Sequence, residues 1–445
     1  MDVKQFQDKP LAHYSYAIVS DGKMALVDPS RDPGPYYRYA LEKKARIVAV
    51  FETHPHADFV SSHLQVHKET GAGIYVSRLV GAAYPHIPFD EGDTFRMGQI
   101  RFSAVNTPGH SPDSITVIAR EGEEYAMFSG DTLFIGDVGR PDLREHAGNM
   151  KAKREALARD MYRTVHNKFN HLPDTTVVYP AHGAGSLCGK NLGSEASGTL
   201  GNERMGNWAF RTVDEETFVQ NILKDQPFIP AYFGYDVELN RNGAESAEGA
   251  IAGVRRFLDP QKTDAFTFVD VRDGKAFREG HFPGSINIMA RTEDDKFETW
   301  LGSIVKPGEP FYLVVPDVDH QRDVMNRVVK IGYEKQMVAV IIPGTGRLQA
   351  SDAFDYEAFR RNPEDFTVVD VRNQAEVAQQ PFFGHAIHIP LPELRDRVKE
   401  IPADKPLVVH CAGGYRSAAG SSIAAGNITG IPVYDLGDRI EDFRK

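Results

Sequence analysis

Short apolar segments separated by turn sequences predict paired strands and αβ units in the first part of the chain. Residues 14–20 and 24–28 are apolar and flank the sequence SDGK, which is a signal for a β-hairpin. A helix-like segment (35–44) and a buried strand (45–52) follow, and a second helix is expected after His54. Because this mixture continues to about residue 190, we expect an α/β domain there.

The second half of the chain contains an internal repeat. Residues 266–288 resemble residues 366–389, and each copy is followed by a second apolar strand, at 311–315 and at 406–409. A repeat of about 100 residues is too long for a solenoid and predicts two related α/β domains in tandem. We therefore expect three domains, with the bounds 1–243, 244–345 and 346–445.

The composition is that of an ordinary globular protein and argues against several functions. Hydrophobic residues make up 41% and charged residues 25% of the 445 residues. No apolar run reaches the roughly 18 residues of a membrane helix, and the N-terminus lacks an export signal, so we expect a cytoplasmic protein without a membrane segment. The formal net charge of −11 argues against general nucleic-acid binding.

Potential metal ligands follow the ends of four apolar strands. In α/β folds, loops at strand ends turn side chains into a cleft where chemistry takes place. Four strand ends with histidine or aspartate at the tip are improbable by chance, so we predict a metal site there. The candidate residues are His54, His56, Asp58, His110, Asp131 and His182.

These motifs resemble those of the metallo-β-lactamase superfamily. The matching sequences are THPHAD, TPGH, GD and PAH in this order, preceded by VDP at Asp28. The resemblance implies an α/β fold built as an αββα sandwich, with the metal at one sheet edge. Phe59 replaces a histidine that binds a second metal in hydrolytic members, so we expect a mononuclear site.

Persulfide dioxygenases are mononuclear members of this superfamily, and the chain resembles them. The resemblance implies one ferrous ion, Fe(II), per chain on His54, His110 and Asp131, with zinc as the other ion to consider at purification. A 2-His-1-carboxylate face leaves positions open for dioxygen and a persulfide sulfur, whereas zinc has no redox chemistry. The segment GRPD suggests that Arg140 binds substrate or, with Asp142, anchors a loop. His56 and Asp58 are expected to orient ligands or substrate, and His182 is expected to form a hydrogen bond within the pocket.

The segment LVVHCAGGYRSAAG predicts a reactive cysteine. A buried strand ends at Cys411, and a helix of small residues follows the loop. Such a loop directs backbone N–H groups and the helix N-terminus at the sulfur, which lowers the pKa of a thiol and stabilises a persulfide. We expect Cys411 and Arg416 to be catalytic and Gly413, Gly414 and Tyr415 to bind substrate.

This loop resembles the active-site loop of rhodaneses, and VDVR (369–372) on the preceding strand supports the resemblance. The spacing Cys-x4-Arg is shorter than the Cys-x5-Arg of cysteine phosphatases and suits a single sulfur atom. In the first copy of the repeat, Asp317 stands where the nucleophile would be, while Arg322 is retained. A carboxylate cannot accept sulfane sulfur, so this copy is predicted to be a degenerate domain that serves as a spacer, docking surface or oligomer contact.

The chain has only two cysteines, Cys188 and Cys411, which excludes a disulfide framework and fits a reducing compartment. Cys188 lies in PAHGAGSLCGKN, a glycine-rich turn that should lie close to the metal. Two readings remain open for it. Cys188 is either a structural thiol in a tight loop or a catalytic thiol that relays sulfur from the persulfide.

The whole chain resembles bacterial persulfide dioxygenase–sulfurtransferase fusions. This resemblance implies oxidation of small thiol persulfides by O2 to sulfite, coupled to sulfur transfer that forms or consumes thiosulfate. Two alternatives stay open: a glyoxalase II-like zinc thioesterase with an accessory sulfur carrier, and a sulfur carrier or persulfide sensor without catalysis at the metal. We expect a homo-oligomer, a dimer or tetramer, and the sequence does not identify the thiol.

Overall fold

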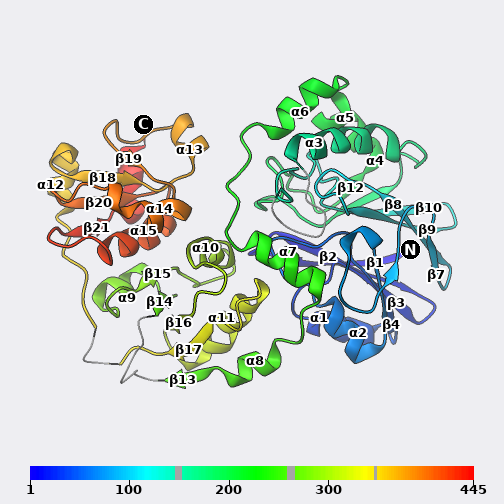
Figure 1. Cartoon of the computed structure of the whole chain (residues 1–445), viewed down its shortest axis with the longest axis horizontal. Helices are drawn as coiled ribbons and strands as arrows, with labels where there is room; N and C mark the ends of the chain where they lie inside the picture. Colours follow the sequence, from blue (N-terminus) through cyan, green and yellow to red (C-terminus); the bar gives the residue numbers. More distant parts are fainter. Residues whose placement is uncertain (146–152, 258–265, 345–347, 445) are drawn as a thin grey trace. The chain divides into compact units, whose positions relative to one another are not determined.

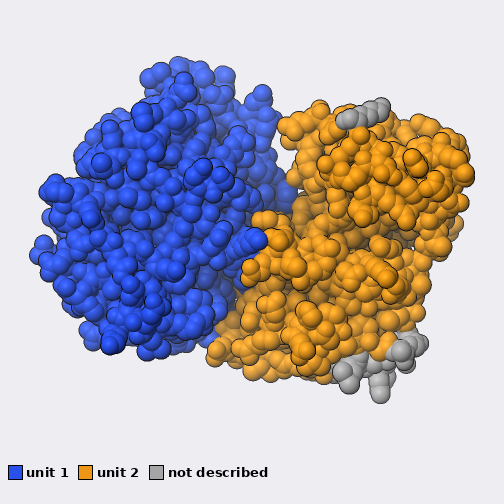
Figure 2. Space-filling view, turned by 180° about the vertical axis from the view of Figure 1, so that it is seen from behind, with its two compact units in different colours: residues 1–246, 330–332 blue, residues 247–329, 333–445 orange. Residues whose placement is uncertain are grey.

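The computed structural model describes residues 1–145, 153–257, 266–344 and 348–444. These residues form two compact units, coloured separately in Figure 2. The first unit contains Met1–Ser246 and Lys330–Gly332, and the second contains Ala247–Val329 and Tyr333–Lys445. The predicted boundary between residues 345 and 346 lies outside the described residues, and the three domain bounds stay a prediction.

Two six-stranded sheets form the centre of the first unit (Figure 1). In spatial order, the first sheet contains β1 (Asp2–Asp8), β2 (His13–Ser20), β3 (Lys23–Val27), β4 (Arg46–Phe51), β5 (Gly73–Val76) and β6 (Ile87–Pro88). The second contains β12 (Gly198–Thr199), β11 (Val177–Pro180), β10 (Glu124–Gly130), β9 (Ile115–Glu121), β8 (Ile100–Asn106) and β7 (Thr94–Met97). The predicted hairpin corresponds to the antiparallel pair β2 and β3.

Alternating side chains build the layers of this unit. On β2, Tyr16 and Ile18 belong to a core between the sheets, which they share with Phe128 of the second sheet. Ala17 lies between them and faces the other way, into a core with Tyr36 of a covering helix. Since successive strand residues point to opposite faces, each sheet buries one face against the other sheet and one against helices. The predicted αββα sandwich is confirmed.

Helices cover the outer faces of both sheets. On the second sheet, Ile118 and Met127 pack with Met161 and Phe218 of two helices. The helices of this unit are α1 (Gly34–Glu42), α2 (His63–Thr70), α3 (Arg154–Arg163), α4 (Leu200–Gly206), α5 (Trp208–Arg211), α6 (Glu215–Leu223) and α7 (Phe233–Asn242).

The two sheets approach each other closely at the edge where the predicted ligands lie. The N–H of Ile115 donates to the carbonyl of Thr53 (2.8 Å), and the N–H of Tyr14 on β2 donates to the carbonyl of Ala181, which directly follows β11 (2.6 Å). Gly130 has a φ of +55°, and a Cβ there would collide with Oγ1 of Thr53, so this position requires glycine. The loops that follow β4 and β10 are thereby held side by side.

The second unit contains two parallel sheets, each with helices, and so agrees with the two α/β domains that the repeat predicts. The first has the order β13 (Arg255–Phe257), β17 (Met337–Ile341), β16 (Phe311–Val314), β14 (Thr267–Asp270) and β15 (Ile286–Asn287), with helices α8 (Glu248–Gly253), α9 (Gly274–Glu279), α10 (Phe297–Ile304) and α11 (Val318–Lys330). The second has the order β19 (Ile387–His388), β18 (Thr367–Asp370), β20 (Leu407–His410) and β21 (Val433–Asp435), with helices α12 (Tyr356–Arg361), α13 (Gln374–Gln379), α14 (Leu391–Arg397) and α15 (Tyr415–Ala425). None of the helices described has the length and apolar character needed to cross a membrane.

Candidate metal centre and sulfur-binding loop

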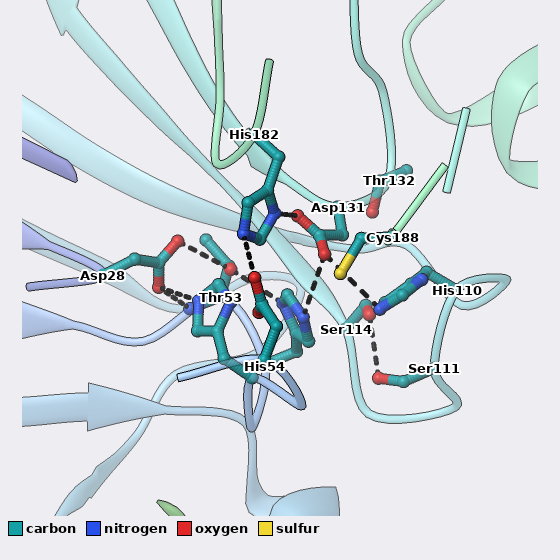
Figure 3. Close-up of polar contacts among 12 residues, drawn as sticks. Asp28, Thr53, His54, His110, Ser111, Ser114, Asp131, Thr132, His182 and Cys188 are labelled. Atoms are coloured by element: carbon teal, nitrogen blue, oxygen red, sulfur yellow. Dashed lines mark hydrogen bonds and ion pairs between the residues drawn. The ribbon is translucent and has the colours of Figure 1, made fainter. Parts of the chain in front are cut away.

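Three of the predicted ligands converge at the sheet edge of the first unit (Figure 3). His54 follows β4, His110 follows β8 and Asp131 follows β10, and all three side chains are buried. Oδ2 of Asp131 lies 3.7 Å from Nε2 of His54 and 3.6 Å from Nε2 of His110. This spacing lets one ion contact all three atoms, so the group can hold a metal.

Hydrogen bonds on the far side of each ring fix the two histidines. Nδ1 of His54 donates to Oγ1 of Thr53 (3.0 Å), whose hydroxyl donates to Asp28 (2.8 Å). Nδ1 of His110 donates to the carbonyl of Arg140 (2.9 Å). Both rings therefore keep the proton on Nδ1 and direct an Nε2 lone pair at Asp131, as metal-bound histidines require. Sequence reasoning missed Thr53, although a hydroxyl residue directly before the first ligand was a readable signal.

The electrostatics of the site fit a cation. Burial lowers the pKa of His54 well below its ordinary value and also lowers the pKa of His110, so both rings are neutral ligands. Burial alone would raise the pKa of Asp131, but His182, His54 and His110 hold it well below its usual value. Among the described residues, Nε2 of His54 and Oδ2 of Asp131 have no hydrogen-bond partner although both are buried. An ion at this position would satisfy both atoms.

His182 connects Asp131 to a second carboxylate. Its Nδ1 donates to Oδ1 of Asp131 (2.7 Å), and its Nε2 lies 2.8 Å from Oδ2 of Asp58. Burial alone would lower the pKa of His182, but the two carboxylates raise it well above its ordinary value. These contacts leave Oδ2 of Asp131 facing the two histidine ligands. They suit the orienting role that we predict for Asp58 and the hydrogen bond within the pocket that we predict for His182.

His56 lies beside the site and packs against an aromatic ring. Its Nε2 lies 3.3 Å from Oδ1 of Asp28, and its ring centre is 4.4 Å from that of Phe59. Phe59 also packs on His13, at 3.9 Å between ring centres. Phe59 thus fills space between two imidazoles. Ligand atoms of three further groups are also close enough to share an ion: His56, Asp131 and His182; Asp58, His182 and Cys188; and Asp28, Glu52 and His56.

Cys188 lies next to the metal centre, as Figure 3 shows. Its thiol is buried, and burial together with the charges of Asp58 and Asp131 raises its pKa well above the ordinary value. The thiol is therefore protonated at neutral pH unless a cation binds nearby. Both readings of Cys188, structural thiol and sulfur relay, stay predictions.

Arg140 has the contacts of a loop anchor. Its Nε and a terminal nitrogen both donate to Asp142 at 2.7 Å, and the side chain also donates to the carbonyls of Leu187 (3.1 Å) and Pro227 (2.7 Å). Its backbone N–H donates to the carbonyl of Cys188 (3.0 Å). The side chain is 1% exposed, and these bonds tie three loops together. A direct substrate contact of Arg140 stays a prediction.

The second site lies in the loop between β20 and α15. The backbone N–H of Gly414 donates to Sγ of Cys411 at 3.1 Å, and Gly414 has a φ of +96°, which favours glycine. Arg416 forms a bidentate pair with Glu376, both bonds being 2.6 Å. Glu376 was not identified from the sequence. Glu376 forms a capping box with Asn373, and this motif can be recognised in the sequence as a signal for the start of helix α13. The motif does not indicate that Glu376 pairs with Arg416.

Gly413 and Tyr415 differ from Gly414 in their surroundings. Gly413 has open space where a side chain would be. The hydroxyl of Tyr415 donates to the carbonyl of Met289 at 2.6 Å. Met289 follows β15 of the five-stranded sheet, whereas Tyr415 follows β20 of the four-stranded sheet. The side chain of Tyr415 therefore contacts the part of the unit that contains the other sheet. Substrate contacts by Gly413 and Tyr415 stay predictions.

Family models match most of both units. The model described as metallo-beta-lactamase superfamily matches residues 8–163. The model described as rhodanese-like domain matches residues 254–344 and 355–438. We call the latter two the first and the last rhodanese-like domain.

Three similar proteins bear on the family. Persulfide dioxygenase ETHE1, mitochondrial, from Homo sapiens is 31% identical over 160 residues, which are 35% of this chain and 58% of that protein. A probable hydroxyacylglutathione hydrolase from Schizosaccharomyces pombe is 29% identical over 175 residues, 38% of this chain and 63% of the relative. This chain therefore spans less than two thirds of either relative. A solved metallo-beta-lactamase from Staphylococcus aureus subsp. aureus COL is 32% identical, with a TM-score of 0.70 over 77% of this chain and 99% of that chain.

Fold and site together define a metal-binding αββα protein joined to two parallel α/β domains. The chain belongs to the metallo-beta-lactamase superfamily and carries two rhodanese-like domains. The predicted relation to persulfide dioxygenase–sulfurtransferase fusions is confirmed by this domain combination and by the persulfide dioxygenase relative.

Proposed function

We propose that the first unit oxidises small thiol persulfides with O2 to sulfite, and that the last rhodanese-like domain transfers sulfane sulfur. The convergence of His54, His110 and Asp131, with two buried ligand atoms that lack partners among the described residues, carries the proposal. The persulfide dioxygenase relative supports the choice of reaction.

One ferrous ion per chain, bound by these three residues, would supply redox chemistry and open positions for dioxygen and sulfur. The protein's part is to keep both Nε2 atoms unprotonated, through Thr53 and the carbonyl of Arg140. In the overall reaction, a thiol persulfide, dioxygen and water give the free thiol and sulfite, with release of protons. The outer sulfur is oxidised and dioxygen is reduced.

The second step would take place on Cys411. A persulfide on Sγ would accept the hydrogen bond of the Gly414 N–H, and its negative charge would lie near Arg416. The Cys411 thiolate would first take the outer sulfur of a thiol persulfide and release the free thiol. Sulfite would then attack this sulfur, its bond to Sγ of Cys411 would break, and thiosulfate would leave while the Cys411 thiolate is restored. The reverse direction uses the same atoms. The thiol carrier, the cytoplasmic location and the homo-oligomer, a dimer or tetramer, stay predictions.

Metal analysis and oxygen uptake on the full-length protein test the first step. Protein purified without oxygen is expected to bind one iron per chain and to consume O2 with glutathione or coenzyme A persulfide. His110→Ala should lose at least about tenfold in iron content and in oxygen uptake. His171→Ala is the matched control, because His171 is exposed on a loop and should behave as the native protein.

A zinc hydrolase similar to glyoxalase II is the second candidate, supported by the hydroxyacylglutathione hydrolase relative. A specific observation favours it: Asp58, His182 and Cys188 bring three ligand atoms together beside the first group, in spite of Phe59. Two zinc ions per chain, with thioester turnover and no oxygen uptake, would establish this candidate and exclude ours. Iron binding without turnover of any persulfide would favour a sulfur carrier or sensor.

A further inference from the structure

We propose that the first rhodanese-like domain, which contains no cysteine, acts as a clamp on the sulfur-binding loop of the last one, with Tyr415 as the positioning residue. The consequence for catalysis rests on the sulfur transfer proposed above for Cys411. The clamp itself rests on contacts within the second unit.

The side chain of Tyr415 inserts into the first rhodanese-like domain. Its hydroxyl donates to the carbonyl of Met289 at 2.6 Å, across 126 positions of sequence. The charges of two ion pairs of that domain, Arg291–Asp295 and Arg327–Glu298, act on the phenol of Tyr415. Burial raises the pKa of Tyr415 well above its ordinary value, so the phenol stays protonated and remains a donor. The acceptor is the backbone carbonyl of Met289, which a substitution of the Met289 side chain does not remove.

Tyr415 directly follows the residue that contacts the sulfur. The N–H of Gly414 donates to Sγ of Cys411, and a Cβ at Gly414 would lie 3.1 Å from backbone atoms of Gly437 and Asp438, so these residues are close to Gly414. The loop is therefore held within its own domain on one side and through Tyr415 on the other. If Tyr415 is released, Gly414 gains freedom, and the N–H spends less time directed at the sulfur.

Two other contacts place the same domain along helix α15. The backbone N–H of Asn287 donates to Oγ of Ser422 at 3.0 Å. The guanidinium of Arg416 lies 6.0 Å from the centre of the Trp300 ring. A cavity of about 580 Å³ is bordered by Gly413 and Tyr415 on one side and by residues of the first rhodanese-like domain, including Met289, on the other. The domain without a nucleophile therefore shapes the surroundings of the loop that has one.

Tyr415→Phe tests the clamp, because it removes only the hydroxyl. Loss of one hydrogen bond predicts a roughly fivefold fall in kcat for sulfur transfer from thiosulfate to a thiol, with little change in KM. The rate of Cys411 alkylation by iodoacetamide is measured against pH by mass spectrometry of the Cys411 peptide. We expect this pH profile to shift to higher pH in the variant. Hydrogen–deuterium exchange at residues 412–416 should become faster.

Ser422→Ala is the matched control. It removes a different hydrogen bond between the same two domains, at a distance from the loop, and should leave the pH profile of alkylation unchanged. Native alkylation and exchange in Tyr415→Phe, or equal effects of both substitutions, would overturn the clamp. The native protein could fail to transfer sulfur while Tyr415→Phe still shifts the pH profile of Cys411 alkylation. This result would support the clamp and contradict the proposed function of Cys411.

Discussion

The two rhodanese-like domains share a pair of neighbouring parallel strands and differ in the loop that follows one of them. Strands β14 and β18 each end in an aspartate that binds an arginine two positions later: Asp270 with Arg272 and Asp370 with Arg372, both pairs at 2.6 Å. Strands β16 and β20 lie next to these strands in parallel, with the same register relation. These shared strands and aspartate–arginine pairs therefore do not determine which of the two domains can bind sulfur.

The loops that follow β16 and β20 use their backbone N–H groups differently. In the last domain, the N–H of Gly414 donates to Sγ of Cys411 (3.1 Å). In the first domain, Oδ1 of Asp317 accepts hydrogen bonds from the N–H groups of Asp319 (2.9 Å) and His320 (3.1 Å). The fixed carboxylate caps helix α11 and takes the bonds that an anionic sulfur would need. In the first domain, the backbone N–H groups of Asp319 and His320 are therefore already bonded to a side chain of the same loop.

Removal of the nucleophile should have the largest effect. Cys411→Ser is expected to reduce sulfur transfer by roughly 1000-fold or more, because a hydroxyl cannot form the persulfide. Oxygen uptake at the metal centre should remain. Thiosulfate formation and oxygen uptake measured on the same sample check this, and joint loss of both would contradict two independent sites.

The arginine of the loop gives the next effect. Arg416→Lys should lower sulfur transfer about tenfold, because lysine cannot form the bidentate pair with Glu376. Arg322→Lys, at the corresponding position of the first domain, should leave the rate unchanged. Equal losses in both variants would show that the first domain takes part in the chemistry.

A cysteine at position 317, where the first domain has aspartate, should have a smaller effect, and the effect should be on stability. Asp317→Cys should not create sulfur transfer in a Cys411→Ser background, because one thiol does not rebuild the loop. It should lower the melting temperature by about 2–4 °C, since the helix loses its cap. Asp317→Asn retains a capping oxygen and is the control. Measurable sulfur transfer by Asp317→Cys would show that this one side chain determines whether a domain can transfer sulfur.

Local sequence signals predicted the shared strands of the two domains and most of the metal site. Apolar runs that stop at a histidine or an aspartate indicated the candidate ligands, and the resemblance to persulfide dioxygenases singled out His54, His110 and Asp131, which follow β4, β8 and β10. Contacts between distant segments were not predictable. The bond from Tyr415 to Met289 depends on how two domains pack, and no periodicity in either segment encodes it.

The shared aspartate–arginine pairs allow the finest comparison, because their surroundings shift the two carboxyls in opposite directions. Burial dominates at Asp270 and raises its pKa above 3.8. At Asp370, burial also acts upward, but Arg372 and His410, which lies 3.6 Å away, hold the pKa below 3.8. The two pairs look alike and should respond differently to pH.

Linkage gives the sign of this difference. A lowered pKa contributes stability that is present above pH 3.8 and is lost as the pH falls below it, whereas a raised pKa makes ionisation of Asp270 increasingly costly as the pH rises. Asp370→Asn should therefore destabilise the protein more than Asp270→Asn at pH 7, by on the order of 1 kcal/mol. Urea unfolding at pH 7 and at about pH 4.5 should show the smaller difference at the lower pH, because there the cost of ionising Asp270 is only partly present. A difference that grows toward acid would mean that Asp270, and not Asp370, is the carboxylate stabilised by its arginine.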